Sequence, residues 1–220
     1  MTPSFIVRRA KERGLSLIGI TDHNSTRQCP EICRIGKREG ISVLCGAEIT
    51  TKEEVHVVVL VEESKVGLLQ DWLDEYLPII PNKEEFFGYQ LVVNELEEVV
   101  YQEHNLLISA LSRSLDEVEA FIHSIGGLFI PAHIDKQQNS LISQLGFVPF
   151  GMKADALEIS KRTDLPKLIS QCSWIKDYCF IRSSDAHFPD DFGDVYTILD
   201  IVEPTFQALK KALFFKKVQL

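Results

Sequence analysis

The chain has 220 residues, of which 32 are acidic and 23 basic, and its net charge is −9. This acidic balance argues against a broad surface that tracks the phosphates of duplex nucleic acid. No apolar run reaches the roughly 18 residues that a membrane span needs, and the first residues lack the apolar core of a secretory signal. The five cysteines show no spacing typical of a disulfide framework. We therefore expect a soluble, cytoplasmic protein that forms one domain over residues 1–220.

Helix and strand patterns alternate from the first residues onward. Thr2 and Pro3 are typical of a helix start, and Gly14 ends this first helix. The apolar runs that follow lack strict alternation, which predicts parallel strands covered on both faces. The predicted strands cover residues 15–20, 41–45, 55–61, 128–131, 156–159, 178–182 and 195–201. The other predicted helices cover residues 30–39, 65–77, 114–125 and 204–215.

The alternation breaks between residues 62 and 113. After a predicted helix, residues 89–93 and 98–102 indicate a hairpin around Asn94 and Glu95. The earlier rhythm resumes where Ser114 and Glu117 form a capping box at the start of a helix. The segment is therefore interpreted as an insertion and not as a second domain.

Potential metal ligands follow nearly every predicted strand. In α/β proteins with a parallel sheet or barrel, catalytic groups gather at the carboxyl ends of strands. Imidazoles and carboxylates in that position are typical of a metal-dependent hydrolase. The candidate ligands and catalytic groups at strand ends are Asp22, His23, Glu48, His133, Asp185 and His187, and His56 lies within the strand pattern of residues 55–61.

Individual residues allow more than one interpretation. Asp22 could orient the ring of His23 or cap the loop that follows. The Glu48 carboxylate needs a partner if it is buried, and two bridged cations would supply one. His56 fits either a metal ligand or a core histidine that bonds a backbone carbonyl. Asp185 and His187 stand two apart in an expected extended segment, so both side chains would point into one cavity.

The segments that carry these residues resemble the PHP superfamily, named for polymerase and histidinol phosphatase. The resemblance lies in residues 20–25 (ITDHNS), 46–50 (GAEIT), 131–133 (PAH), 157–160 (LEIS) and 183–187 (SSDAH). It covers most of the chain, and residues 90–94 (QLVVN) of the insertion resemble one bacterial branch of predicted phosphoesterases. The resemblance implies a distorted seven-stranded (β/α) barrel with up to three Mn, Zn or Fe ions at its strand ends. It also implies phosphoester hydrolysis by a metal-bound hydroxide.

The family roles can be carried over residue by residue. The resemblance implies that Glu48, His56 and His133 hold one ion completely. It assigns Glu48 and Asp185 to a second ion, and His23 and His187 to a third. The mixed imidazole and carboxylate ligands suit Mn, Fe and Zn alike.

The second and third ion sites are incomplete. Family members begin with a strand that bears a His-x-His motif and a further Asp or His, and no residue of this sequence matches these ligands. We therefore expect a barrel that lacks its first strand. The sequence either begins inside a longer protein or belongs to a protein that has lost this strand. The exposed edge of an open barrel is an aggregation liability, which favours the first explanation.

The expected function is that of a metal-dependent phosphoesterase acting on a small phosphomonoester, a nucleotide or an oligonucleotide end. Four basic residues follow the predicted strands and are candidates for binding substrate phosphate, namely Arg27, Lys136, Lys161 and Arg162. The expected partner is thus a small phosphorylated substrate or nucleotide, without a membrane or an extended duplex. A homo-oligomer is compatible with the sequence.

Three other interpretations stay open. The missing ligands suggest a catalytically impaired or non-catalytic module that binds metal or a nucleotide. A metal-dependent amidohydrolase would also place histidines and an aspartate at strand ends, but such barrels typically use a bridging lysine, and no lysine ends a strand suitably in this sequence. A barrel whose histidines are only structural would bind no stoichiometric metal.

Overall fold

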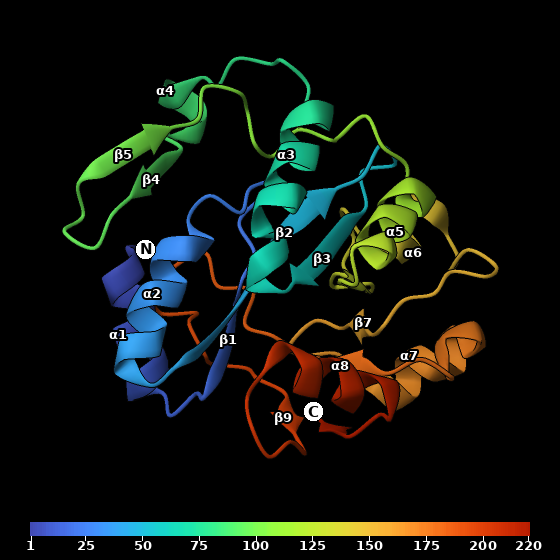
Figure 1. Ribbon diagram of the computed structural model, residues 1–220. Coiled ribbons are helices and arrows are strands. Elements are labelled where there is room, and N and C mark those ends of the chain that lie inside the picture. The colour runs from blue at the N-terminus through green and yellow to red at the C-terminus, as the bar shows by residue number, and fades with distance from the viewer.

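A mixed β-sheet with helices on both faces forms the centre of the computed structural model, which describes residues 1–220 (Figure 1). The order of its strands is β1-β2-β3-β6. Strand β1 is parallel to β2, whereas β3 is antiparallel to both β2 and β6. The strands of this sheet are β1 (Leu17–Ile20), β2 (Ser42–Thr50), β3 (His56–Val61) and β6 (Leu128–Pro131).

Shorter strands form three further pairs. The pair β7 and β8 is parallel and continues the central sheet beyond β6, because backbone hydrogen bonds flank β7 on that side. The Asp155 N–H donates to the Phe129 carbonyl oxygen (3.0 Å), and the Ile134 N–H donates to that of Glu158 (2.9 Å). The other two pairs are antiparallel. The short strands are β4 (Leu91–Val93), β5 (Val99–Gln102), β7 (Leu157–Glu158), β8 (Phe180–Ile181), β9 (Ile198–Leu199) and β10 (Val218–Gln219).

The strands do not close into a barrel. Strand β1 pairs only with β2, so its other edge is open and the predicted seven-stranded barrel is not confirmed. The prediction that the long apolar strands are all parallel is wrong for β3. Only residues 51–55 connect β2 to β3, and a parallel connection requires a crossover of a dozen or more residues.

The side chains of the central sheet alternate between two apolar clusters, one on each face. Cys45, Val57 and Phe129 belong to the larger cluster of 35 buried residues. Leu44 and Leu60 belong to a cluster of nine, which also contains residues of the last helix, α8. Both faces of the sheet are therefore covered, as predicted. The helices are α1 (Pro3–Glu12), α2 (Cys29–Glu39), α3 (Val66–Tyr76), α4 (Glu84–Phe87), α5 (Leu115–Ser124), α6 (Leu141–Leu145), α7 (Leu165–Gln171) and α8 (Phe206–Phe214), with short 3-10 helices at Glu63–Lys65 and Ser173–Ile175.

Local sequence signals set several helix ends. Gly40 ends α2 with a φ of 77°, a conformation that suits glycine. The capping box of Ser114 and Glu117 starts α5 as predicted. Helix α8 begins two residues later than predicted, because the Thr205 hydroxyl accepts a hydrogen bond from the Ala208 N–H (3.2 Å) and caps it.

The insertion contains the predicted hairpin, formed by β4 and β5. In Figure 1 this hairpin and α4 lie to one side of the sheet, next to α2. The side-chain amide of Gln28 joins the two elements, because its nitrogen donates to the Val93 carbonyl oxygen (2.9 Å) and its oxygen accepts from the Val93 N–H (3.0 Å). The insertion is thus tied to the start of α2, shortly after His23.

Candidate metal centre

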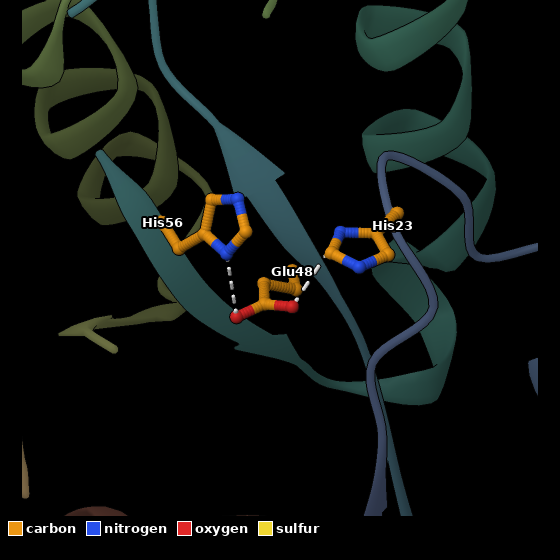
Figure 2. A group of neighbouring side chains, drawn as sticks. All are labelled: His23, Glu48 and His56. Carbon is orange, nitrogen blue, oxygen red and sulfur yellow. Dashed lines mark ion pairs between the residues drawn. The ribbon is translucent and has the colours of Figure 1, made fainter. Parts of the chain in front are cut away.

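Three imidazoles converge on the buried carboxylate of Glu48. His56 Nδ1 lies 3.3 Å and His133 Nε2 lies 3.4 Å from Glu48 Oε1. His23 Nδ1 lies 3.5 Å from the other oxygen, Oε2. Figure 2 shows His23 and His56 on opposite sides of this carboxylate. The tertiary structure therefore brings together four of the six residues predicted to bind metal.

The mixed sheet explains how these residues meet. Glu48 lies inside β2 and not after it, because β2 continues to Thr50. His56 is the first residue of β3, and the antiparallel pairing sets it opposite Thr50, at the carboxyl end of β2. His133 follows β6, which is parallel to β2. His56, at the beginning of its strand, thus lies next to Glu48 and His133, which lie near the carboxyl ends of theirs.

Backbone hydrogen bonds fix the loop that carries His23. The Asn24 N–H donates to the Glu48 carbonyl oxygen (3.0 Å), and the Glu48 N–H donates to that of Asp22 (3.1 Å). The Asn24 side chain is held in turn by the Leu107 and Ser109 carbonyl oxygens. His23 is therefore positioned by an extension of the β1–β2 pairing.

The electrostatics of the cluster favour the protonation states that metal ligation requires. Desolvation opposes ionisation of Glu48, but the neighbouring His133 and His56 rings outweigh it and hold the pKa of this carboxyl well below its usual range. Burial lowers the pKa of His23, against the opposing charge of Glu48. Glu48 is consequently ionised and His23 is neutral near pH 7, as metal ligands must be.

The donor set fits a divalent ion. Donor atoms of His23, Glu48 and His56 all lie within 4.8 Å of one another. The Nδ1 atom of His23 is buried and has no hydrogen-bond partner. An unpaired buried nitrogen is destabilising, and coordination would satisfy it. Mixed nitrogen and oxygen donors suit Mn, Fe and Zn.

Asp185 and His187 are arranged more loosely. Asp185 has a φ of 46°, so the predicted extended geometry is wrong at this residue, which lies in an irregular loop after β8. The Asp185 carboxylate pairs with Lys136 Nζ (2.7 Å). His187 Nδ1 lies 2.9 Å from the Asp185 carbonyl oxygen, and its side chain is 57% exposed. The His187 ring centroid is 6.1 Å from that of His23, so this pair lies beside the Glu48 cluster.

Asp22 enters the site through its backbone. Its carbonyl oxygen accepts hydrogen bonds from the N–H groups of Glu48 (3.1 Å) and Ser25 (3.5 Å). Desolvation by the surrounding chain raises the pKa of its carboxyl, although solvent reaches the side chain. Its role in orienting His23 stays a prediction.

The four basic residues predicted to bind phosphate lie in different settings. Arg27 pairs with Asp74 (2.6 Å), and its guanidinium lies 4.6 Å from the centre of the Tyr101 ring. Lys161 pairs with Asp194 (2.9 Å), and Arg162 is exposed. Of these four residues, Lys136 is the one that contacts a predicted metal ligand, namely Asp185.

Sequence reasoning missed the role of Glu158 and Ser183. Glu158 ends β7 and is buried, its Oε2 accepts from the His133 N–H (3.1 Å), and its Oε1 accepts from the Ser183 hydroxyl. Desolvation raises the pKa of this carboxyl against both hydrogen bonds. The signal was present, because an acidic residue at the end of an apolar strand is the feature that identified the other candidates.

Imidazole and carboxylate donors at the strand ends of an α/β fold define a candidate metal-dependent hydrolase. The chain belongs to the PHP domain family, whose model matches residues 1–139. An uncharacterized protein of Methanocaldococcus jannaschii is 37% identical over 67 residues, which cover 30% of this chain and 39% of that protein. None of the helices is both long and apolar enough to cross a membrane.

Solved structures show the same fold. A lesion-specific endonuclease from Pyrococcus furiosus has a TM-score of 0.66 and 18% identity, over 97% of this chain and 51% of the endonuclease. A candidate metal-dependent phosphoesterase from Bifidobacterium adolescentis has a TM-score of 0.60 and 18% identity, over 100% of this chain and 92% of the other. The chain thus spans about half the length of the endonuclease.

Proposed function

We propose that this chain is a metal-dependent phosphoesterase that hydrolyses a small phosphomonoester, a nucleotide or an oligonucleotide end. The observation that carries the proposal is the convergence of His23, His56 and His133 on the buried Glu48 carboxylate. Membership of the PHP family supports it. The fold shared with a candidate metal-dependent phosphoesterase and with a lesion-specific endonuclease supports it too.

The residues of the chain have distinct tasks in this reaction. Divalent Mn, Zn or Fe ions would supply charge for the phosphate oxygens and lower the pKa of a bound water. Glu48 and the three histidines would hold the ions, and the pairing of β2 with β3 keeps Glu48 and His56 in place. The Lys136 ammonium, next to Asp185, can neutralise a phosphate oxygen of the substrate.

The charge distribution favours a compact substrate. The net charge is −9. Two of the basic residues, Arg27 and Lys161, already pair with Asp74 and Asp194. A duplex requires many phosphate contacts along an extended surface, whereas a single phosphate requires a few local charges. We therefore place a small phosphorylated molecule or a nucleic-acid end in the site rather than a long duplex.

A second candidate function is a metal- or nucleotide-binding module without turnover. The observation that favours it is the loose arrangement of Asp185 and His187, since one is paired with Lys136 and the other is largely exposed. Such a module would bind metal at the Glu48 cluster but would lack the second group of donors that clamps both oxygens of the reacting ester.

One assay separates these functions. The protein is loaded with Mn2+ and its turnover of p-nitrophenyl phosphate and of a 5′-phosphorylated dinucleotide is measured. His133→Ala is the test variant, and His104→Ala, at an exposed histidine outside the cluster, is the matched control. The proposal expects turnover by the wild type and His104→Ala but not by His133→Ala. Equal turnover by all three would contradict the proposal, and Mn2+ binding without turnover would favour the module.

A further inference from the structure

Glu158 lies between two turns that carry candidate ligands. Strand β7, which it ends, lies between β6 and β8, so its carboxylate reaches the end of each neighbouring strand. One oxygen accepts from the backbone N–H of His133 (3.1 Å), which follows β6. The other accepts from the hydroxyl of Ser183, which follows β8 two residues before Asp185. Glu158 as a whole is 5% exposed, so both hydrogen bonds are shielded from water.

Both turns contain a ligand residue in an unfavourable backbone conformation. His133 has a φ of 30° and Asp185 has a φ of 46°. Residues other than glycine rarely adopt positive φ, and such conformations persist only where surrounding contacts hold them. The hydrogen bonds of Glu158 are contacts of this kind, made directly to His133 and, through Ser183, to the turn of Asp185.

We propose that Glu158 is a positioning residue of the metal centre, whose carboxylate ties the His133 turn to the turn of Ser183 and Asp185. This tie sets the separation between the compact donors around Glu48 and the looser donors after β8. The inference rests on the proposed function, because it assigns Glu158 a task in the same metal site. Glu158 acts through the backbone of His133 and through Ser183, and it does not coordinate the metal itself.

Asp155 provides a natural comparison at the other end of the same strand. Its Oδ2 accepts from the Phe129 N–H (2.8 Å) and lies 3.1 Å from His123 Nε2. It therefore links the segments of β6 and β7 just as Glu158 does, but neither residue that it contacts belongs to a segment with a candidate metal ligand. Asp155→Asn and Glu158→Gln each replace one carboxyl group by an amide in a link between the same two strands. A purely structural role predicts similar consequences for both variants.

Mn2+ titration calorimetry on the full chain tests the inference. Glu158→Gln keeps one acceptor oxygen and replaces the other by an amide donor, so we expect its Mn2+ affinity to fall about 10- to 100-fold, as is typical for groups that support metal ligands. Asp155→Asn should bind Mn2+ like the wild type, even if both variants lose similar thermal stability. Equal Mn2+ affinity in Glu158→Gln and the wild type would overturn the inference.

Ser183→Ala gives an independent arm that keeps the buried carboxylate. It removes one of the two hydrogen bonds, so we expect a smaller loss of Mn2+ affinity. Added to Glu158→Gln, it should cost less than it does alone, because both changes interrupt the same link. Fully additive losses would overturn the link through Ser183. This arm also decides the question if Glu158→Gln fails to fold.

Amide NMR of the metal-free protein separates failure of the inference from failure of the proposed function. The backbone amide signals of His133 and Asp185 should both shift in Ser183→Ala and Glu158→Gln, and stay in place in Asp155→Asn. An Asp185 signal that does not move would overturn the inference, whatever the metal data show. A wild type that binds no Mn2+ would overturn the proposed function, and the amide shifts would still decide whether the tie exists.

Discussion

The two sides of the candidate metal centre are held in different ways. Glu48 and His56 lie on strands paired over six successive positions, so backbone hydrogen bonds determine where both side chains lie. Asp185 and His187 follow β8, a strand of two residues, and lie in an irregular loop. Ligands on well-paired strands are positioned before a metal binds, whereas ligands on loops depend on side-chain contacts such as those of Glu158 and Lys136.

The largest effect is expected from Glu48→Gln. All three histidines of the compact side face this carboxylate, and the amide can neither carry its charge nor bridge two ions. Mn2+ affinity should fall by about 100-fold or more, beyond the usual effect of a residue that merely supports a ligand. Calorimetric titration measures this change. Glu54→Gln, an exposed position in the adjacent turn, is the matched control, and a similar loss there would contradict the interpretation.

A comparison of His56→Ala with His187→Ala tests the difference between the two sides directly. His56 lies 3.3 Å from Glu48, whereas the His187 side chain is 57% exposed and bonds only its own turn. We expect Mn2+ affinity to fall about 10- to 100-fold in His56→Ala and less than about tenfold in His187→Ala. An equal or larger loss in His187→Ala would show that the exposed side is the tighter metal site.

A smaller effect is expected from Lys136→Met, which keeps most of the length of the side chain and removes its charge. If Lys136 binds substrate phosphate, KM for p-nitrophenyl phosphate should rise up to about fivefold, which corresponds to the upper value of about 1 kcal/mol for an exposed ion pair. Mn2+ affinity should not fall, because Asp185 loses a competing cation. Steady-state kinetics with Lys153→Met as the exposed control tests this. An unchanged KM would remove Lys136 from the substrate site.

The smallest effect concerns the pH dependence of the stability of the metal-free protein. Burial lowers the pKa of His23 from its ordinary value of 6.5, so the unfolded chain binds more protons just below pH 6.5 and the free energy of unfolding falls as pH drops through that range. The low pKa of Glu48 acts only below its ordinary value of 4.5, where its stabilising contribution is lost on acidification. The free energy of unfolding, measured by urea unfolding between pH 5 and about pH 7, should depend less steeply on pH in His23→Gln than in the wild type. Identical slopes would contradict the assigned pKa direction.

Several parts of the fold follow from local chemistry and were predicted. The capping box of Ser114 and Glu117 and the end of the predicted helix at residue 39 depend on neighbouring residues alone. The hairpin of β4 and β5 likewise follows from two apolar runs around a turn. The direction of β3 was predicted wrongly because periodicity reports burial and not strand direction. The connection of nine residues between the predicted strands at 41–45 and 55–61 was the signal that could have corrected it, because it is shorter than a parallel crossover requires.

The candidate metal ligands can be recognised from the amino-acid sequence alone, because imidazoles and carboxylates next to buried strands are chemically distinctive. Their division into a compact group and a looser group depends on the tertiary structure. Antiparallel pairing places His56 beside Glu48, and a loop with positive φ sets Asp185 apart from them. Strand register and loop conformation depend on contacts between residues far apart in the chain, such as Glu158 with His133, and local patterns do not contain that information.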